Sequence, residues 1–317
     1  MKEEYGREEL LKKIEWGAEY QFVPVDIPEK FLRDRQFVIE ALKLNGDVYR
    51  QLPDDMKKRD KEIIILAAQH HDSWLLLKID DSLYDDREFV LKLLSVNGQC
   101  IFHVSKHIEI DEEILLTAIG QYYGAAAFIP WERRSDREYA LKISKISGRT
   151  LSYFSEELRD DEEIVFNCAS RSYRAFESAS DRLKNDGEFL NKLLFANPAC
   201  LAYAGRNFRC DRQLCEKLME IHPYVYRYVS KELKGDVEFI VKAMRHCPEL
   251  FTRIPFEKRY DKTVRARLNE LSKDPGVSVE VRETLRMRLR LDAAWAKEFR
   301  PELLDGTKDE DDDPPED

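Results

Sequence analysis

An aspartate recurs through this 317-residue chain at an almost constant interval, and this recurrence constrains the fold more than any other feature. The successive intervals are 26, 26 and then 25 residues seven times in succession. A fixed period of this length is typical of stacked-repeat proteins, in which each repeat buries its apolar face only against its neighbours. The recurring residues are Asp34, Asp60, Asp86, Asp111, Asp136, Asp161, Asp186, Asp211, Asp236 and Asp261.

Each aspartate stands before a segment with helical periodicity. In the repeat that starts at Asp86, apolar residues follow at three, four, seven and eight positions, which are Phe89, Val90, Leu93 and Leu94. This spacing places them on one stripe of an α-helix. The aspartate suits the N-cap, since its carboxylate accepts bonds from the unpaired first amides and interacts favourably with the helix dipole.

Seven of the ten repeats also carry a glutamate two residues after the aspartate, and a lysine often follows four residues later. Residues four apart are neighbours on a helix surface, so we expect ion pairs within one helix. The expected pairs are Glu88 and Lys92, Glu138 and Lys142, Glu188 and Lys192, and Glu238 and Lys242.

The first helix of a repeat should end about eleven residues after its aspartate, where pairs such as Asn45-Gly46 and Asn97-Gly98 occur. Glycine can adopt the left-handed conformation that closes a helix. A second apolar segment with a spacing of three follows, as in Leu151 and Phe154, and a turn then leads to the next aspartate. The sequence therefore predicts an all-α solenoid or superhelix of about ten helix-turn-helix repeats of 25 to 26 residues, with a C-terminal capping helix.

The two ends depart from the pattern, as the ends of a solenoid do, because a terminal repeat has one face without a neighbour. We expect a degenerate N-terminal capping unit over residues 1–33, tandem repeats over 34–261 and C-terminal capping helices over 262–299. In the last helix Leu285, Leu289, Trp295 and Phe299 are available to cover the final repeat. Residues 300–317 are predicted to form an acidic, disordered tail.

Composition narrows the class of protein. The net charge of −10 disfavours nucleic acid as a partner unless basic residues gather on one face. No segment has the pattern of a signal peptide or the length of a membrane span, so we expect no membrane partner. The six cysteines lack the spacing of a disulfide scaffold or a zinc site and are typical of reduced thiols in the cytoplasm.

The repeats "DREFVLKLLSVNGQCIFHVSKHIEID" and "DEEIVFNCASRSYRAFESASDRLKND" resemble a known family. They are similar to the tandem repeats grouped as domain of unknown function 4116, which occur in bacterial and protist proteins. The resemblance covers roughly residues 30 to 262, although repeats around Tyr122-Tyr123 and Ser172-Tyr173 lack the Asn-Gly pair. It implies a repeat scaffold and carries over no reaction, substrate or catalytic residue.

The common catalytic and phosphate-binding motifs are absent from the sequence: there is no GxxxxGK[ST], GxGxxG, GxSxG or HExxH. We therefore expect no enzyme, no catalytic residue and no cofactor. His103 and His107 are four residues apart, and Glu109 and Asp111 follow them, so these side chains could form a metal site if the segment were helical. The segment between the two histidines crosses an expected turn. No metal site is predicted.

Two columns of residues are candidates for partner binding. The basic column stands two residues before six consecutive aspartates and comprises Arg134, Arg159, Lys184, Arg209, Lys234 and Arg259. In a solenoid it would form a row suited to an acidic peptide or an extended polyanion. The same residues could instead complete the preceding helix ends.

The tyrosine column stands one residue before a buried column of the second segment and comprises Tyr153, Tyr203 and Tyr228, with His103, Phe128 and Ser178 at the same position. Tyrosines along a surface offer large contact area to a peptide, although partial burial between repeats is the alternative. Our leading hypothesis is a cytoplasmic scaffold that binds a protein or peptide partner of unknown identity. The alternatives are a solenoid that binds nucleic acid or another polyanion through the basic column, and an enzyme with an unrecognised site.

Overall fold

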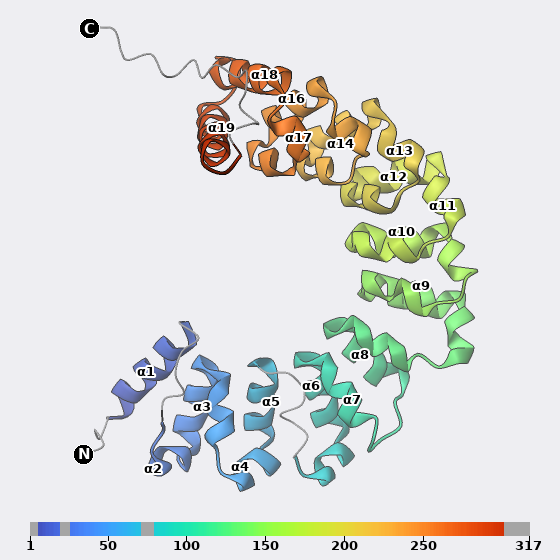
Figure 1. The fold of residues 1–317 in the computed structure, drawn as a ribbon. Coiled ribbons are helices and arrows are strands. Elements are labelled where there is room, and N and C mark those ends of the chain that lie inside the picture. Colours follow the sequence, from blue (N-terminus) through green and yellow to red (C-terminus); the bar gives the residue numbers. More distant parts are fainter. Residues whose placement is uncertain (1–5, 20–25, 71–78, 301–317) are drawn as a thin grey trace. The chain divides into compact units, whose positions relative to one another are not determined.

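The computed structural model describes residues 6–19, 26–70 and 79–300 (Figure 1). The chain is an all-α repeat solenoid, and the described residues contain no β-strand. It divides into two compact bodies, Met1–Cys168 and Ala169–Asp317, which are described separately below. The predicted disorder of residues 301–317 lies outside the described residues.

Each repeat begins with a helix that follows directly on its aspartate. All ten aspartates accept a backbone N–H of the first turn, as predicted; Asp186, for example, accepts from Phe189 at 2.9 Å. The first helices are α3 (Arg35–Leu44), α5 (Lys61–His70), α6 (Arg87–Val96), α8 (Glu112–Gln121), α9 (Arg137–Ile146), α10 (Glu162–Arg171), α12 (Gly187–Ala196), α14 (Arg212–Ile221), α16 (Val237–His246) and α18 (Lys262–Lys273).

The second segment of a repeat is a 3₁₀ helix. Its apolar residues are spaced by three, which matches the three residues per turn of that helix, so they share one line of its surface. Three of these helices begin with proline, which is tolerated where the first N–H has no helical partner. They are η1 (Gly46–Gln51), η4 (Gly98–Cys100) with α7 (Ile101–Val104), η5 (Tyr123–Phe128), η7 (Gly148–Tyr153), η9 (Tyr173–Ser178), η10 (Pro198–Tyr203), η11 (Pro223–Arg227) and η12 (Pro248–Arg253).

The expected turn before the next aspartate contains a third, short helix in most repeats. Proline, serine or glycine precedes six of these eight helices, and Ser180 and Ser230 cap theirs with the side-chain hydroxyl. These helices are α4 (Asp54–Arg59), η3 (Asp81–Asp85), η6 (Trp131–Ser135), η8 (Leu158–Asp160), α11 (Asp181–Asn185), α13 (Arg206–Cys210), α15 (Lys231–Lys234) and α17 (Phe256–Arg259). The repeat therefore has three helical pieces where the sequence predicts two.

The junction between the first two helices differs from the expectation for glycine. Asn45 and Asn97 end their helices in an extended conformation, and Gly98 does not adopt a positive φ. A Cβ on Gly98 would lie 2.2 Å from the carbonyl oxygen of Ala118 in the next repeat. Glycine is needed here because the backbones of adjacent repeats approach closely.

The repeats stack helix on like helix within each body. In the N-terminal body α1 (Arg7–Glu19), α3, α5, α6, α8 and α9 pack in succession, and α2 (Glu29–Leu32) packs on α3. Figure 1 shows these first helices standing side by side in sequence order. In the C-terminal body α14, α16, α18 and α19 (Val279–Phe299) pack in succession, while η9 to η12 form a second row. Leucine pairs such as Leu93 and Leu94 are fully buried between neighbours.

The last helix, α19, closes the C-terminal body and is anchored by a charged contact. Leu285 and Leu289 are buried, as predicted. Asp292 accepts a hydrogen bond from Arg259 Nη1 at 3.2 Å and lies 3.9 Å from Arg265 Nη1. Trp295, 42% exposed, packs on Phe256 with ring centroids 6.1 Å apart, whereas Phe299 is 59% exposed.

Candidate interaction surface

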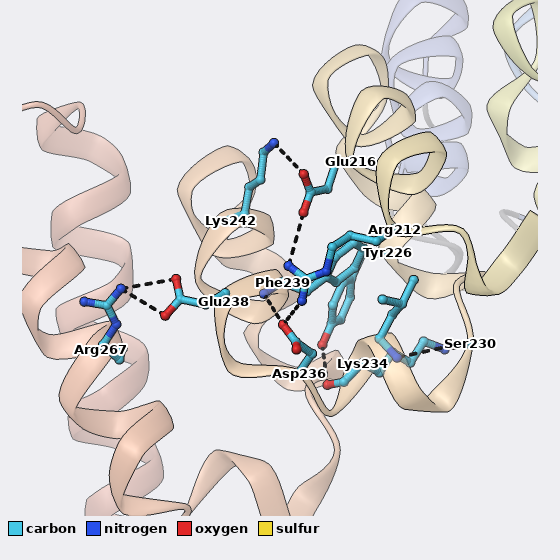
Figure 2. Close-up of polar contacts among 11 residues, drawn as sticks. Arg212, Glu216, Tyr226, Ser230, Lys234, Asp236, Glu238, Phe239, Lys242 and Arg267 are labelled. Carbon is cyan, nitrogen blue, oxygen red and sulfur yellow. Dashed lines mark hydrogen bonds and ion pairs between the residues drawn. The ribbon is translucent and has the colours of Figure 1, made fainter.

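Ion pairs join consecutive repeats along the edge where the first helices begin. In several repeats an arginine follows the capping aspartate and reaches the aspartate and glutamate of the next repeat. Arg137 contacts Asp161 at 2.6 Å and Glu163 at 2.9 Å, and Arg35 contacts Asp60 and Glu62 in the same way. In Figure 2 the C-terminal body shows the counterpart, in which Arg212 lies between Glu216 and Asp236.

Along this edge the negative charges of several capping aspartates are neutralised by arginines of the preceding repeat. The hydrogen bonds that Asp111 accepts from Arg87 and from the backbone N–H of Ile114 lower the pKa of Asp111. The hydrogen bond to Asp111 in turn raises the pKa of Arg87. A carboxylate that is already paired offers little attraction to a further cation. The acidic row that marks the repeats in the sequence is therefore part of the scaffold.

Two of the four lysines expected to pair within their own helices pair across repeats instead. Lys142 contacts Glu112 of the preceding repeat. Lys242 contacts Glu216 at 3.0 Å (Figure 2) and Glu220 at 3.6 Å. Only Lys192 and Glu188, at 2.9 Å, form the predicted pair among those described. The prediction is wrong for Lys142 and Lys242, because a facing helix brings an acid closer than the helix's own first turn does.

The basic column lies half-buried where the third helix meets the second. Lys184 Nζ donates to the carbonyl of Glu177 at 2.7 Å, and Lys234 Nζ donates to that of Arg227 at 2.7 Å. Arg134 donates to the carbonyls of Ala127 and Ile129, both at 3.2 Å. These contacts place charged groups on the C-terminal carbonyls of the 3₁₀ helices, where the helix dipole favours them.

The same column also joins neighbouring repeats through its backbone. The carbonyls of Arg134, Lys184 and Arg209 accept the N–H groups of Ser155, Gly205 and Ser230 in the following repeat. The Nε atoms of Arg159, Arg209 and Arg259 are buried without a hydrogen-bond partner, and Arg259 pairs with Asp292 through Nη1. Much of the basic column is thus engaged inside the scaffold.

The tyrosine column contributes to an aromatic cluster in the C-terminal body. The ring of Tyr173 lies 6.1 Å from that of Tyr203 and 5.9 Å from that of Tyr228. The hydroxyls of Tyr173 and Tyr228 are hydrogen-bonded to each other. All three tyrosines are half-buried on η9, η10 and the end of η11, so each presents part of its ring to solvent. This packing fits offset aromatic contact.

Two arginines flank these rings. Arg174 lies 5.9 Å from the Tyr173 ring centroid and donates to its hydroxyl at 3.4 Å, which lowers the pKa of Tyr173. Arg227 is exposed and contributes to the same shift. We call the set Tyr173, Arg174, Tyr203, Arg227 and Tyr228 the tyrosine–arginine surface.

The tyrosine–arginine surface adjoins a positively charged area formed by Arg209, Arg227, Lys234 and Arg253. Burial lowers the pKa of Lys234, and the nearby charges of Arg209, Arg227 and Arg253 lower it further. Within the described ranges, Arg227 and Arg253 have no carboxylate partner. Guanidinium groups without a carboxylate partner, near partly exposed aromatic rings, are suited to bind a carboxylate and an apolar side chain together.

Tyr153 lies in a separate cluster in the N-terminal body. Burial raises its pKa, followed by the influence of Tyr123 and Tyr122. Arg149 stands 4.1 Å from the Tyr123 ring centroid, and Phe102 packs against Phe128 at 5.3 Å. The N-terminal body thus repeats the combination of aromatic rings and arginine on its own 3₁₀ helices.

The sequence prediction found part of the tyrosine–arginine surface. Tyr203 and Tyr228 share a column and each packs on Tyr173, whereas the sequence prediction does not include Tyr173, Arg174 or Arg227. Tyr173 occupies the first position of its 3₁₀ helix rather than the last, so it lies in another column. The signal that marks the cluster is arginine next to tyrosine in "SYRAF" and "VYRYV".

Most of the cysteines are buried. Burial raises the pKa of Cys100, Cys200 and Cys215 to about 12, which keeps these thiols protonated. His107 stacks on Tyr84 with ring centroids 4.2 Å apart. In the part of the chain that the structure describes, no group of three or more His, Cys, Asp or Glu residues is arranged to hold a metal ion.

Comparison with known proteins identifies the repeat. The model of the family described as Domain of unknown function (DUF4116) matches residues 19–57, 60–109, 86–134, 136–184, 161–209, 186–234 and 211–257. Searches of curated proteins and of solved structures give no match. Over the described ranges, no helix is both long enough and apolar enough to cross a bilayer.

Proposed function

Because the chain belongs to the family described as Domain of unknown function (DUF4116), with matches along most of its length, we propose that it is a non-enzymatic scaffold. In this proposal the repeats hold a protein or peptide partner, as the extended surfaces of stacked repeats commonly do. The partner binds on the tyrosine–arginine surface, and the protein acts in the cytoplasm. The six free thiols support that location.

One observation carries the proposal. Three partly exposed tyrosines and the exposed Arg174 and Arg227 gather on neighbouring 3₁₀ helices, whereas the arginines along the edge of the first helices face carboxylates. Tyrosine and arginine are the residue types most enriched at the centre of protein interfaces. Arg227 and Arg253 add unpaired positive charge, so the partner is expected to carry acidic residues.

Binding of nucleic acid or another polyanion through the basic column is the weaker alternative. A polyanion needs accessible charges along its path. Lys184 and Lys234 are half-buried and use their ammonium groups on carbonyls of the 3₁₀ helices. The geometry therefore favours a structural role for the basic column over phosphate binding.

The proposal is tested by selecting linear peptides from a displayed library on the full chain and measuring their dissociation constants by fluorescence anisotropy. Selected peptides should be acidic, and the double variant Arg174→Glu/Arg227→Glu should bind them at least about tenfold more weakly, since buried charge contacts are worth roughly 1.4 kcal/mol or more. Tyr203→Ala/Tyr228→Ala should also weaken binding, with little dependence on salt.

Lys217→Glu/Lys262→Glu is the matched control, because it makes the same change of charge at exposed lysines elsewhere in the C-terminal body. It should leave the affinity unchanged apart from a small general effect of charge. Equal affinity of wild type, the arginine variant and the tyrosine variant would contradict the proposal. A single-stranded oligonucleotide that binds tightly with a steep salt dependence would favour the polyanion alternative.

A further inference from the structure

The charge of the chain is concentrated in its last residues. Residues 301–317 contain nine acidic residues and one lysine, a net charge of −8 out of −10 for the whole chain. The other 300 residues therefore carry only −2. The acidity inferred from composition belongs to the segment that follows α19, not to the repeats.

That segment starts close to the positively charged area. Arg300 is the C-cap residue of α19. The ring of Trp295, five residues earlier, lies 6.1 Å from that of Phe256, and Phe256 follows Arg253 by three residues. The described chain thus ends five residues after a contact with α17, the third helix of the repeat that begins at Asp236.

The segment is also long enough to reach the tyrosine–arginine surface. Seventeen residues span at most roughly 55 to 60 Å when extended. Arg253, Arg227 and Arg174 stand on η12, η11 and η9, in a row of 3₁₀ helices that pack in succession. Packed helices are separated by roughly 10 Å, so the whole row lies within that reach.

We propose that residues 305–317, with the sequence "DGTKDEDDDPPED", bind the tyrosine–arginine surface of their own chain and compete there with an acidic partner. The inference rests on the proposed function, since both use the same surface. Carboxylates of the run Asp309 to Asp313 pair with Arg227 and Arg253, which have no carboxylate partner among the described residues. A segment in the same chain acts at an effective concentration on the order of 1 mM. Residues 305–317 can therefore occupy the surface even if their affinity is low, and a partner must bind more tightly to displace them.

The test uses the full chain and a labelled synthetic peptide with the sequence of residues 305–317. The neutral-tail variant carries Asp309→Asn, Glu310→Gln, Asp311→Asn, Asp312→Asn and Asp313→Asn. If the peptide binds this variant with a Kd of about 100 µM, competition in cis should weaken binding to the wild-type chain by about tenfold. Fluorescence anisotropy at low and high salt measures both values.

Variants of the surface keep the result specific. Adding Arg227→Glu/Arg253→Glu to the neutral-tail variant should weaken peptide binding at least about tenfold, whereas Lys217→Glu/Lys262→Glu should leave it nearly unchanged. Equal affinity for wild type and the neutral-tail variant would overturn the inference. An affinity for the peptide that is unchanged by Arg227→Glu/Arg253→Glu would also overturn it.

Failure of this inference is distinguishable from failure of the proposed function. If library peptides still require Arg174 and Arg227 while the tail peptide binds both chains equally, only the competition by residues 305–317 is refuted. If neither peptide responds to the arginine variants, the surface itself is refuted, and the inference falls with it.

Discussion

In several repeats the capping aspartate has two structural roles, one for each of its oxygens. Asp60 Oδ1 accepts the N–H groups of Glu62 and Ile63, which caps α5, while Oδ2 accepts from Arg35 of the preceding repeat at 2.6 Å. Its first role follows from sequence, because capping is local. The second depends on an arginine 25 residues earlier and becomes visible only in the packed structure.

Gly98 is a position where a single methyl group should destabilise the fold. Its Cβ would lie 2.2 Å from Ala118 O and 2.9 Å from Tyr122 N, two backbone atoms that hydrogen-bond to each other. Because backbone cannot rotate away as a side chain can, Gly98→Ala should lower the free energy of unfolding by about 1 to 3 kcal/mol. Chemical denaturation measures this.

Gly120→Ala is the matched control in the same body. A Cβ there meets only Ile146 Cγ2 at 3.8 Å, which is an ordinary contact, and Gly120 lies within α8. Alanine should stabilise the helix by roughly 0.5 to 1 kcal/mol. A Gly98→Ala variant as stable as wild type would show that the two repeats are not so closely packed.

At the scale of elements, the helices are too short to be stable alone. The first helices have ten residues in all repeats but the last, while isolated helices below about 12 to 15 residues are marginal in water. Their stability comes from burial against neighbours and from contacts such as Asn97 Nδ2 to Ala68 O at 3.0 Å. A single repeat is therefore not expected to fold by itself.

The sequence predicts some of these elements better than others. The aspartate caps and the buried stripe, for example Phe89 and Leu93, are predictable because both depend on spacing within one helix. The spacing of three predicts a helix but not its 3₁₀ geometry, and the sequence predicts a turn where the third helix lies. The pairing of Lys242 with Glu216 could not be predicted, since it depends on how closely two repeats approach.

The cross-repeat ion pairs should make stability depend on pH. In the folded state the hydrogen bond from Arg87, together with the Ile114 N–H, lowers the pKa of Asp111 below its unfolded value of about 3.9. A lowered carboxyl pKa contributes stability above the unfolded pKa, and this contribution is lost as pH falls through the folded pKa. Acid should therefore weaken the junction between these repeats.

Arg87→Ala tests this dependence. At pH 7 the variant should melt roughly 1 to 2 °C below wild type, because exposed pairs contribute little each. The difference should shrink towards zero as the pH is lowered below 4, where Asp111 takes up a proton in both proteins. Lys217→Ala, at an exposed lysine with no ion-pair partner among the described residues, should show no such trend. A difference that grows in acid would contradict the assignment.

At the scale of the whole molecule, stability is a sum of contacts between neighbours, as in other repeat proteins. A defect in the core of one repeat should therefore destabilise that repeat and its immediate neighbours most. Phe189 is 4% exposed and packs against Phe176 of the preceding repeat, with ring centroids 6.2 Å apart. An unpaired charge at this position cannot be solvated.

Phe189→Asp should cost at least about 4 kcal/mol and expose α12, η9 and η10 to solvent first. Hydrogen exchange should then show lost protection in these elements while α3, α5 and α6 remain protected. Phe195→Asp is the control on the same helix, since Phe195 is 45% exposed. Uniform loss of protection along the chain would mean that the repeats unfold as one cooperative unit.

The candidate surface was less predictable than the scaffold. Tyr203 and Tyr228 share a position in the repeat, so a column could be drawn from sequence. Tyr173 joins them from a different position and from two repeats before Tyr228. The basic column is as regular as the tyrosine column, yet its groups bind backbone carbonyls, because regular spacing records contacts within the scaffold as readily as exposure.

The arginines that span some of the junctions have a consequence for how such a chain can change in length. Arg137 finds an aspartate and a glutamate 24 and 26 residues further on, and Arg35 meets the same two residue types one repeat ahead. Excising or duplicating one whole period would present each arginine with an equivalent pair, whereas an insertion of any other length would misalign every bridge at that junction. Unequal recombination should therefore yield folded chains that differ in length by whole repeats. Each added repeat brings its own capped helix and its own charged residues for the junction.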